Sequence, residues 1–143
     1  MKNKMKVTFA PLGENERFAR LVIAGFMMPL DPTLQEMEDV KTAVSEAVTN
    51  CIIHGYECEK EEKEIAMEAE IIDQSLHITV QDWGIGIDDI EKAMQPFYTS
   101  KPKLERSGMG FSFMETFMDQ VHVESKPLEG TKVCLVKRIG GKA

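Results

Sequence analysis

Two stretches of alternating side chains, residues 65–71 and 76–81, leave few folds open to this chain. In both stretches an apolar side chain occupies every second position, which predicts strands with one buried face and one wet face. The turn-forming run Asp73, Gln74 and Ser75 separates them, so the two strands are expected to pair as a hairpin. The sequence therefore predicts that the middle of the chain forms part of an antiparallel sheet.

An amphipathic helix is predicted near the N-terminus. Its apolar residues recur at helical spacing until Pro29 ends the pattern, and they are Phe18, Leu21, Val22, Gly25 and Phe26. Glu16 and Arg20 fall on the opposite side of this helix, so we expect both charged side chains to face solvent. A short strand over residues 5–9 precedes the helix.

A longer helix is predicted next, and its start is marked by a capping box. The Thr33 hydroxyl and the Glu36 carboxylate can satisfy backbone N–H groups there. An apolar stripe continues from this start almost to Gly55, which is a plausible terminator. Towards the C-terminus, residues 120–125 and 131–137 alternate as two further strands around a turn.

The bulk properties of the chain restrict its class. A length of 143 residues is short for two ordinary domains, so a single domain over residues 1–143 is expected. The net charge of −7 opposes nucleic-acid binding, which depends on cationic contacts to phosphate. No apolar run is long enough to span a membrane. The three cysteines lack disulfide or zinc-site spacing and suit the reduced thiols of a cytoplasmic protein.

Glu46 and Asn50 stand one helical turn apart on the long helix, off its apolar stripe, so they share one face. Beside a nucleotide, a carboxylate can act as general base for an incoming hydroxyl or water, and a carboxamide oxygen can bind Mg²⁺. We assign these candidate roles to Glu46 and Asn50, respectively. Taken alone, the pair is more simply explained as part of a solvated helix face.

Asp82 ends the second strand of the hairpin on its apolar side and is followed by Trp83-Gly84-Ile85-Gly86. Burying a carboxylate without hydrogen-bond donors is costly, so a partner must supply them. Adenine presents a donor in its N6 amino group, whereas guanine presents an acceptor at that place. The pattern predicts adenine binding, with Gly84 and Gly86 allowing the backbone to approach a ligand. A strand-end aspartate that caps a turn is the alternative.

A polar connection is predicted over residues 88–107, where charge and proline interrupt scattered apolar positions. We expect this segment to be a mobile lid. Gly108 and Gly110 then open another helix, whose first N–H groups favour a phosphate. A plain loop-to-helix junction is the alternative. The lid carries three basic side chains that could join a polyphosphate cradle, Lys101, Lys103 and Arg106.

In this order, the elements resemble the GHKL superfamily of ATP-binding domains: an Asn-bearing helix, an Asp-x-Gly-x-Gly turn, a polar lid and a Gly-x-Gly helix start. The resemblance spans most of the chain. More narrowly, residues 46–56, Glu-Ala-Val-Thr-Asn-Cys-Ile-Ile-His-Gly-Tyr, resemble the N-box of free-standing serine kinases that act as anti-sigma factors. The match is strongest to the anti-sigma F factors of spore-forming bacteria. Cys51 stands where that pattern leads us to expect alanine.

The resemblance implies an α/β (α+β) fold, a two-layer sandwich of helices on one face of a mixed, mainly antiparallel sheet. It implies ATP or ADP and Mg²⁺ as ligands. It gives Glu46 as the catalytic base, Asn50 as the Mg²⁺ ligand and Asp82 as the adenine-binding residue. The other implied binding residues are the lid hinges Gly84 and Gly86, the phosphate contacts Gly108 and Gly110, and Thr131, which would reach adenine through water.

The resemblance also implies protein partners. These are a sigma factor of the F type that is held inactive, an anti-anti-sigma antagonist that is phosphorylated on serine, and a second copy of the chain paired through residues 5–9. Arg20 and Glu16 are candidates for partner docking. Three alternatives are a general-stress anti-sigma kinase of the same branch, a nucleotide-gated binding module without phosphoryl transfer, and the detached catalytic half of a histidine kinase. The histidine-kinase alternative is disfavoured, because the sequence shows no neighbouring helical domain that bears a phosphoacceptor histidine.

Overall fold

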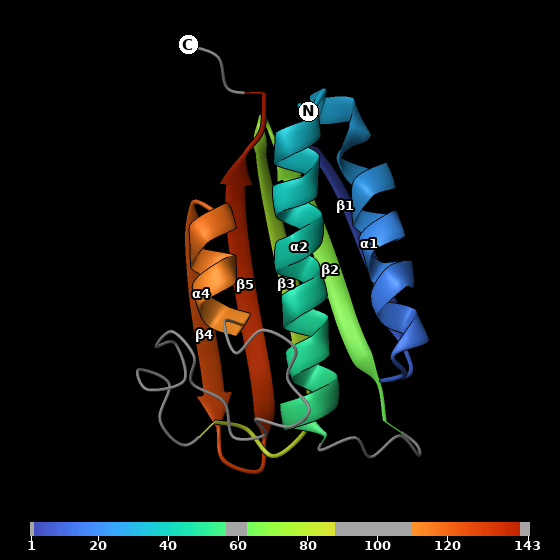
Figure 1. Ribbon diagram of the computed structural model, residues 1–143, viewed down its shortest axis with the longest axis vertical. Coiled ribbons are helices and arrows are strands. Elements are labelled where there is room, and N and C mark those ends of the chain that lie inside the picture. Colours follow the sequence, from blue (N-terminus) through green and yellow to red (C-terminus); the bar gives the residue numbers. More distant parts are fainter. Residues whose placement is uncertain (1, 57–62, 88–109, 141–143) are drawn as a thin grey trace.

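The sheet of this protein has five strands in the order β1-β2-β3-β5-β4, in a computed structural model that describes residues 2–56, 63–87 and 110–140 (Figure 1). The strands are β1 (Lys2–Phe9), β2 (Ile65–Ile72), β3 (Ser75–Asp82), β4 (Gln120–Lys126) and β5 (Gly130–Arg138). Every pairing between these strands is antiparallel. The predicted hairpin is confirmed as β2–β3, in which Met67 lies opposite Val80.

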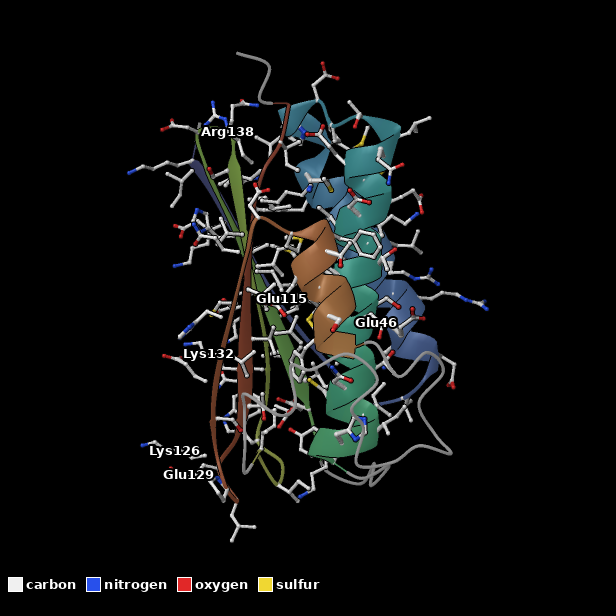
Figure 2. The ribbon with its side chains drawn as sticks, turned by 60° about the vertical axis from the view of Figure 1, so that its left-hand side comes forward. Glu46, Glu115, Lys126, Glu129, Lys132 and Arg138 are labelled. Carbon is white, nitrogen blue, oxygen red and sulfur yellow. The ribbon has the colours of Figure 1, made fainter. Side chains whose placement is uncertain are left out.

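The helices of the described residues all lie on one face of the sheet, and none of them covers the other face (Figure 1 and Figure 2). They are α1 (Glu14–Met27), α2 (Leu34–Asn50) and α4 (Gly110–Phe117). A 3₁₀ turn, η1 (Met28–Leu30), follows α1, and α2 continues into a π-helical turn, η2 (Cys51–Gly55). Helix α2 packs against both α1 and α4. The predicted α+β sandwich is therefore confirmed, with a sheet that is antiparallel throughout its described strands.

The core lies between the two layers. The predicted capping box begins α2, since the Glu36 N–H donates to the Thr33 hydroxyl at 3.0 Å and the Thr33 N–H donates to Glu36 Oε1 at 2.9 Å. Most of the predicted stripe of α2 is buried, whereas Leu34, at the first turn, remains 86 % exposed. Figure 2 shows Lys132 and Arg138 on the open face of the sheet, away from the helices.

The predicted buried face of α1 is partly wrong. The fully buried positions are Ala19, Ile23 and Met27, whereas Leu21 is 71 % exposed. The buried row of this helix begins at Glu16, which has only 7 % of its surface exposed. This charged side chain has polar partners in the seam between α1 and α2. The buried row of α1 is therefore not the stripe that its apolar residues alone predict.

Candidate functional site

One end of the sandwich gathers most of the predicted site residues. Asp82 is the last residue of β3, and Thr131 lies opposite it on β5. Asn50 is the last residue of α2, directly before the η2 turn. The β4–β5 turn lies at the same end of the molecule, at the bottom of Figure 1, and the N-terminal end of α4 points toward that end. The fold therefore brings the predicted metal and adenine elements to one region.

The Asp82 carboxylate is buried, with 3 % of the residue exposed. Its Oδ1 accepts hydrogen bonds from the backbone N–H groups of Gly84, at 2.9 Å, and Thr131, at 3.2 Å. Loss of water raises the pKa of Asp82 above its usual range, although hydrogen bonding by the Gly84 N–H, the Cys51 thiol and the Thr131 N–H acts to lower it. A further hydrogen-bond donor would therefore stabilise the ionised form.

The loop after β3 is held against the end of α2 by direct backbone contact. A Cβ atom at Gly84 would lie 1.9 Å from the Gly55 carbonyl oxygen, and one at Gly55 would lie 2.5 Å from Asp82 Oδ2. Only glycine allows such an approach at either position. The Gly55 carbonyl also accepts a hydrogen bond from the Ile85 N–H at 2.9 Å. The end of α2 thus forms one wall around the Asp82 carboxylate.

The β4–β5 turn holds the other side of this loop. Gly86 has a φ of +77°, and a Cβ atom there would lie 2.1 Å from the Lys126 carbonyl oxygen. The Ile87 N–H donates to the Ser125 hydroxyl at 2.7 Å. Figure 2 shows Lys126 at this turn. Close packing explains the glycine at this position, and the hinge role assigned to Gly84 and Gly86 stays a prediction.

Tyr56 is a site residue to which the sequence analysis gave no role. Its hydroxyl donates to the Glu64 carbonyl at 2.6 Å and accepts from the Trp83 N–H at 2.8 Å. It therefore joins the end of η2 to the start of β2 and the end of β3. A cavity of about 430 Å³ lies beside it, lined by Tyr56, Lys63, Glu64 and Trp83. The sequence signal that could have identified Tyr56 was a large polar side chain directly after the predicted helix.

Ser125 was also missed. Its hydroxyl donates to the Gly130 carbonyl at 3.0 Å and lies 2.9 Å from the Thr131 hydroxyl. Thr131 itself is 9 % exposed, and its backbone N–H reaches Asp82. The predicted water-bridged role of Thr131 is untested, but the residue lies beside the carboxylate that it was expected to assist. Ser125 lies beside Thr131 and Asp82 because of the pairing register of β4 and β5, which the sequence pattern alone does not give.

Glu46 and Asn50 are half-buried residues on the same helix, α2. Figure 2 shows Glu46 on the helical layer, on the side away from the sheet. Within residues 2–56, 63–87 and 110–140, no group of three or more His, Cys, Asp or Glu side chains could hold a metal ion. A Mg²⁺ ion that uses one protein oxygen together with phosphate and water needs no such group. The roles of both residues stay predictions.

Glu16 does not face solvent, contrary to the prediction. Its carboxylate accepts a hydrogen bond from the Ser45 hydroxyl of α2, and the Arg20 Nε lies 3.2 Å from Glu16 Oε1. These partners compensate a carboxylate whose side chain is 9 % exposed. The Arg20 side chain keeps 36 % of its surface exposed. Of the two predicted docking residues, Arg20 is thus the more accessible.

Two predicted features cannot be compared with this geometry. Gly108 and the predicted lid over residues 88–107 lie outside the described residues. Gly110 is the first residue of α4, so a helix begins where one was predicted, and the role of Gly110 as a phosphate contact stays a prediction. No helix among the described residues has the length and apolar character of a membrane span.

Relatives of known name cover almost the whole chain. The family described as the histidine kinase-like ATPase domain matches residues 10–137. An anti-sigma F factor of Clostridium perfringens is 55 % identical over 139 residues, covering 97 % of this chain and 99 % of that protein. The anti-sigma F factor of Clostridium beijerinckii is 57 % identical over 95 % of this chain and 94 % of its own. That of Oceanobacillus iheyensis is 52 % identical, with coverages of 97 % and 94 %.

Solved structures share the fold at lower identity. A Mycobacterium tuberculosis protein with RsbU and RsbW domains gives a TM-score of 0.67 at 17 % identity, over 96 % of this chain and 32 % of that chain. The catalytic domain of the histidine kinase ThkA gives 0.58 at 16 % identity, over 94 % and 96 % of the two chains. At these identities the similarity shows the fold alone.

The raised pKa of Asp82 predicts that this residue lowers the stability of the fold at neutral pH. A carboxyl group whose folded-state pKa exceeds its ordinary value of 3.8 stabilises the fold when protonated, and that contribution is lost as pH rises through the folded-state pKa. We therefore expect Asp82→Asn to become progressively more stable than the wild type as pH rises from about 4 towards 7.

Urea unfolding of both proteins at a series of pH values measures this difference. Glu115→Gln, at an exposed position of α4, is the control and should follow the wild type at every pH. Wild-type and Asp82→Asn stabilities that run parallel across the range would show that burial of this carboxylate has no energetic cost.

Proposed function

The chain belongs to the anti-sigma F factors, which carry the histidine kinase-like ATPase domain, and on this basis we propose that it is an ATP-dependent serine-protein kinase that inhibits a sigma factor. Its relatives are named for action against sigma F, so the proposed target is a sporulation sigma factor of that type. The proposed kinase substrate is a serine of the anti-anti-sigma antagonist. A general-stress sigma factor is the less favoured target, because the relatives named here are all anti-sigma F factors.

The observation that carries the proposal is the incompletely compensated carboxylate of Asp82. It lies buried at the end of β3 with a raised pKa, at the end of the molecule where α2 ends and toward which the N-terminal end of α4 points. The N6 amino group of adenine is a donor of the kind that this carboxylate lacks. Guanine would place an acceptor against it and be repelled. The residues present therefore fit ATP or ADP.

Asn50 and Glu46 would share the chemistry on one face of α2. Mg²⁺, when bound, would neutralise charge on the phosphate oxygens during transfer. Asn50 would hold this ion through its carboxamide oxygen. Glu46 would accept the proton of the attacking serine hydroxyl. Gly110, at the start of α4, would direct a backbone N–H toward phosphate, with Gly108 before it.

The protein surfaces proposed for partners lie on α1 and β1. Arg20 keeps exposed surface while Glu16 fixes one side of its guanidinium, so Arg20 would contact an acidic group of the sigma factor or the antagonist. Strand β1 pairs with β2 along one side and is one of the two edge strands of the described sheet, with β4 at the other edge. We assign its other side to a second copy of the chain in a cytoplasmic homodimer.

The adenine-binding role assigned to Asp82 is tested by comparing the affinities of the protein for adenine and guanine nucleotides. Wild-type protein should bind ATP and ADP far more tightly than GTP in isothermal titration calorimetry. Asp82→Asn should weaken ADP binding about ten- to a hundredfold, because a charge-assisted hydrogen bond is lost. Glu115→Gln serves as the control and should bind ADP as the wild type does. Equal affinity of the wild-type protein for ATP and GTP would rule out this role for Asp82.

Substitutions of Glu46 and of Asn50 should impair different steps. Glu46→Gln removes the proton acceptor, so phosphate transfer to the antagonist should fall about 10²–10⁴-fold while Mg²⁺-ATP and the sigma factor still bind. Asn50→Ala removes a metal ligand and should weaken Mg²⁺-ATP binding itself, together with each nucleotide-dependent step.

Transfer of labelled γ-phosphate to the antagonist, measured beside retention of the sigma factor, separates these outcomes. Glu38→Gln, an exposed position on the first half of the same helix, is the matched control. A Glu46→Gln protein that transfers phosphate at the normal rate would favour the alternative of a nucleotide-gated binding module, or a different base.

The docking role of Arg20 is tested by substituting it and, as a control, substituting the neighbouring Arg17. Arg20→Ala should weaken binding of the sigma factor about tenfold or more, because arginine is a frequent hot-spot residue, while ADP affinity stays normal. Arg17→Ala removes the same charge from an exposed position of α1 and should have a smaller effect. Equal losses for the two variants in surface plasmon resonance would indicate a general charge effect and no specific contact.

A further inference from the structure

A buried carboxylate in the seam between α1 and α2 fixes one edge of the Arg20 guanidinium. Glu16 has 7 % of its surface exposed, a degree of burial that glutamate rarely reaches unless it is paired. Its Oε1 accepts a hydrogen bond from the Ser45 hydroxyl of α2 and lies 3.2 Å from the Arg20 Nε, one helical turn further along α1. Both partners meet the same oxygen atom, so two helices set its position.

The buried edge limits which donors Arg20 can offer. Its Nε is buried and has no hydrogen-bond partner within the described part of the chain, so the pairing with Glu16 is an electrostatic contact. The side chain as a whole keeps 36 % of its surface exposed. A guanidinium donates through Nε and through its two terminal amino groups. Of these donors, only the terminal amino groups can reach a protein that docks on the solvent side of α1.

This arrangement favours a carboxylate as the recognised group. The two terminal amino groups of an arginine form a fork that matches the two oxygens of a carboxylate. Phosphate also fits such a fork, but the Glu16 charge already offsets that of Arg20, which suits a singly charged group better than a doubly charged one. The adjoining surface of α1 is basic and apolar, since Arg17 and Leu21 are exposed. An aspartate or glutamate beside apolar side chains is complementary to this surface.

The contact with Glu16 also reduces the entropy that docking removes. An unrestrained arginine side chain on a helix surface samples many rotamers, and this freedom is lost when a partner immobilises it. Here Glu16 restricts the guanidinium before a partner arrives, and Ser45 restricts Glu16 in turn. Glu16 and Ser45 therefore act on docking through Arg20 and need touch no atom of the partner.

We propose that Glu16 and Ser45 are positioning residues that present the terminal amino groups of Arg20, end-on, to a carboxylate of the bound sigma factor. The inference rests on the docking role proposed for Arg20. It adds the two residues that orient this side chain and the chemical class of the group that it recognises. The geometry also requires arginine at this position, because the single nitrogen of lysine cannot serve both Glu16 and a partner.

A double-mutant cycle tests the positioning role. Binding of an F-type sigma factor at saturating Mg²⁺-ATP is measured by surface plasmon resonance for Glu16→Ala, Arg20→Ala and the double variant. Glu16→Ala should weaken binding about three- to tenfold, because a guanidinium without its anchor loses more rotamer freedom on docking. In the Arg20→Ala background the same change should alter affinity less than about twofold, since no guanidinium is left to orient.

Further variants separate positioning from support of the fold. Ser45→Ala should weaken sigma binding by a smaller factor, and Glu16→Gln should recover part of the affinity, because its amide oxygen can still accept. Arg20→Lys should bind almost as weakly as Arg20→Ala. Glu14→Ala, the control, removes the same charge from an exposed position in the first turn of α1 and should bind as the wild type does. Normal ADP affinity in every variant shows that the fold is intact.

The recognised group is identified from the side of the partner. Each exposed aspartate and glutamate of the sigma factor is replaced by its amide, one at a time. One such change should weaken binding to the wild-type protein about tenfold and have little effect on binding to Arg20→Ala. If no acidic residue of the sigma factor behaves in this way, the recognised group is not a carboxylate.

The remaining outcomes separate this inference from the proposed function. A Glu16→Ala protein with normal sigma affinity, beside a weakened Arg20→Ala protein, contradicts the positioning role while the docking role of Arg20 stands. Equal losses from Glu16→Ala in both backgrounds show that Glu16 only supports the helix seam. An Arg20→Ala protein with normal sigma affinity contradicts the docking role itself, and the role of Glu16 and Ser45 fails with it.

Discussion

Burial of one carboxylate at the end of β3 sets the requirements for everything around it. Removing Asp82 from water is unfavourable unless donors replace the lost hydration. The loop after β3 provides one N–H through Gly84, strand β5 provides another through Thr131, and Gly55 of η2 packs closely against Asp82 Oδ2. The residue therefore ties the two layers of the sandwich together where a ligand is proposed to bind.

The close backbone contacts around this group make the site end a single unit. The Gly55 carbonyl touches Gly84, and the loop that follows lies against the β4–β5 turn. A change in any one of these segments must displace the others, because there is no side chain between them to absorb a shift. The Glu16 and Ser45 contact between α1 and α2 is a separate polar link in the helical layer. The regions proposed for docking and for nucleotide binding thus share α2 as their common support.

The parts of this structure that could be predicted from sequence are those governed by local pattern. Alternation along residues 65–71 and 76–81 gave the hairpin, and the Thr33 and Glu36 pair gave the start of α2, because both signals lie within a few residues. The inward direction of Asp82 followed from the same alternation. Burial of Glu16 could not be predicted, since its partner Ser45 lies on another helix, and the position of Tyr56 depends on contacts with two strands.

The π-helical turn at the end of α2 has a consequence for the spacing of this region. In this turn the Tyr56 N–H bonds to the Cys51 carbonyl at 2.9 Å, five residues back, so the turn holds one residue more than an α-helical turn. Deleting one residue from 51–55 would leave the four-residue spacing of an α-helical turn and would remove this wider hydrogen bond. Gly55, which packs against the Asp82 carboxylate, would then be shifted relative to it, so the number of residues in this turn matters as much as their identity.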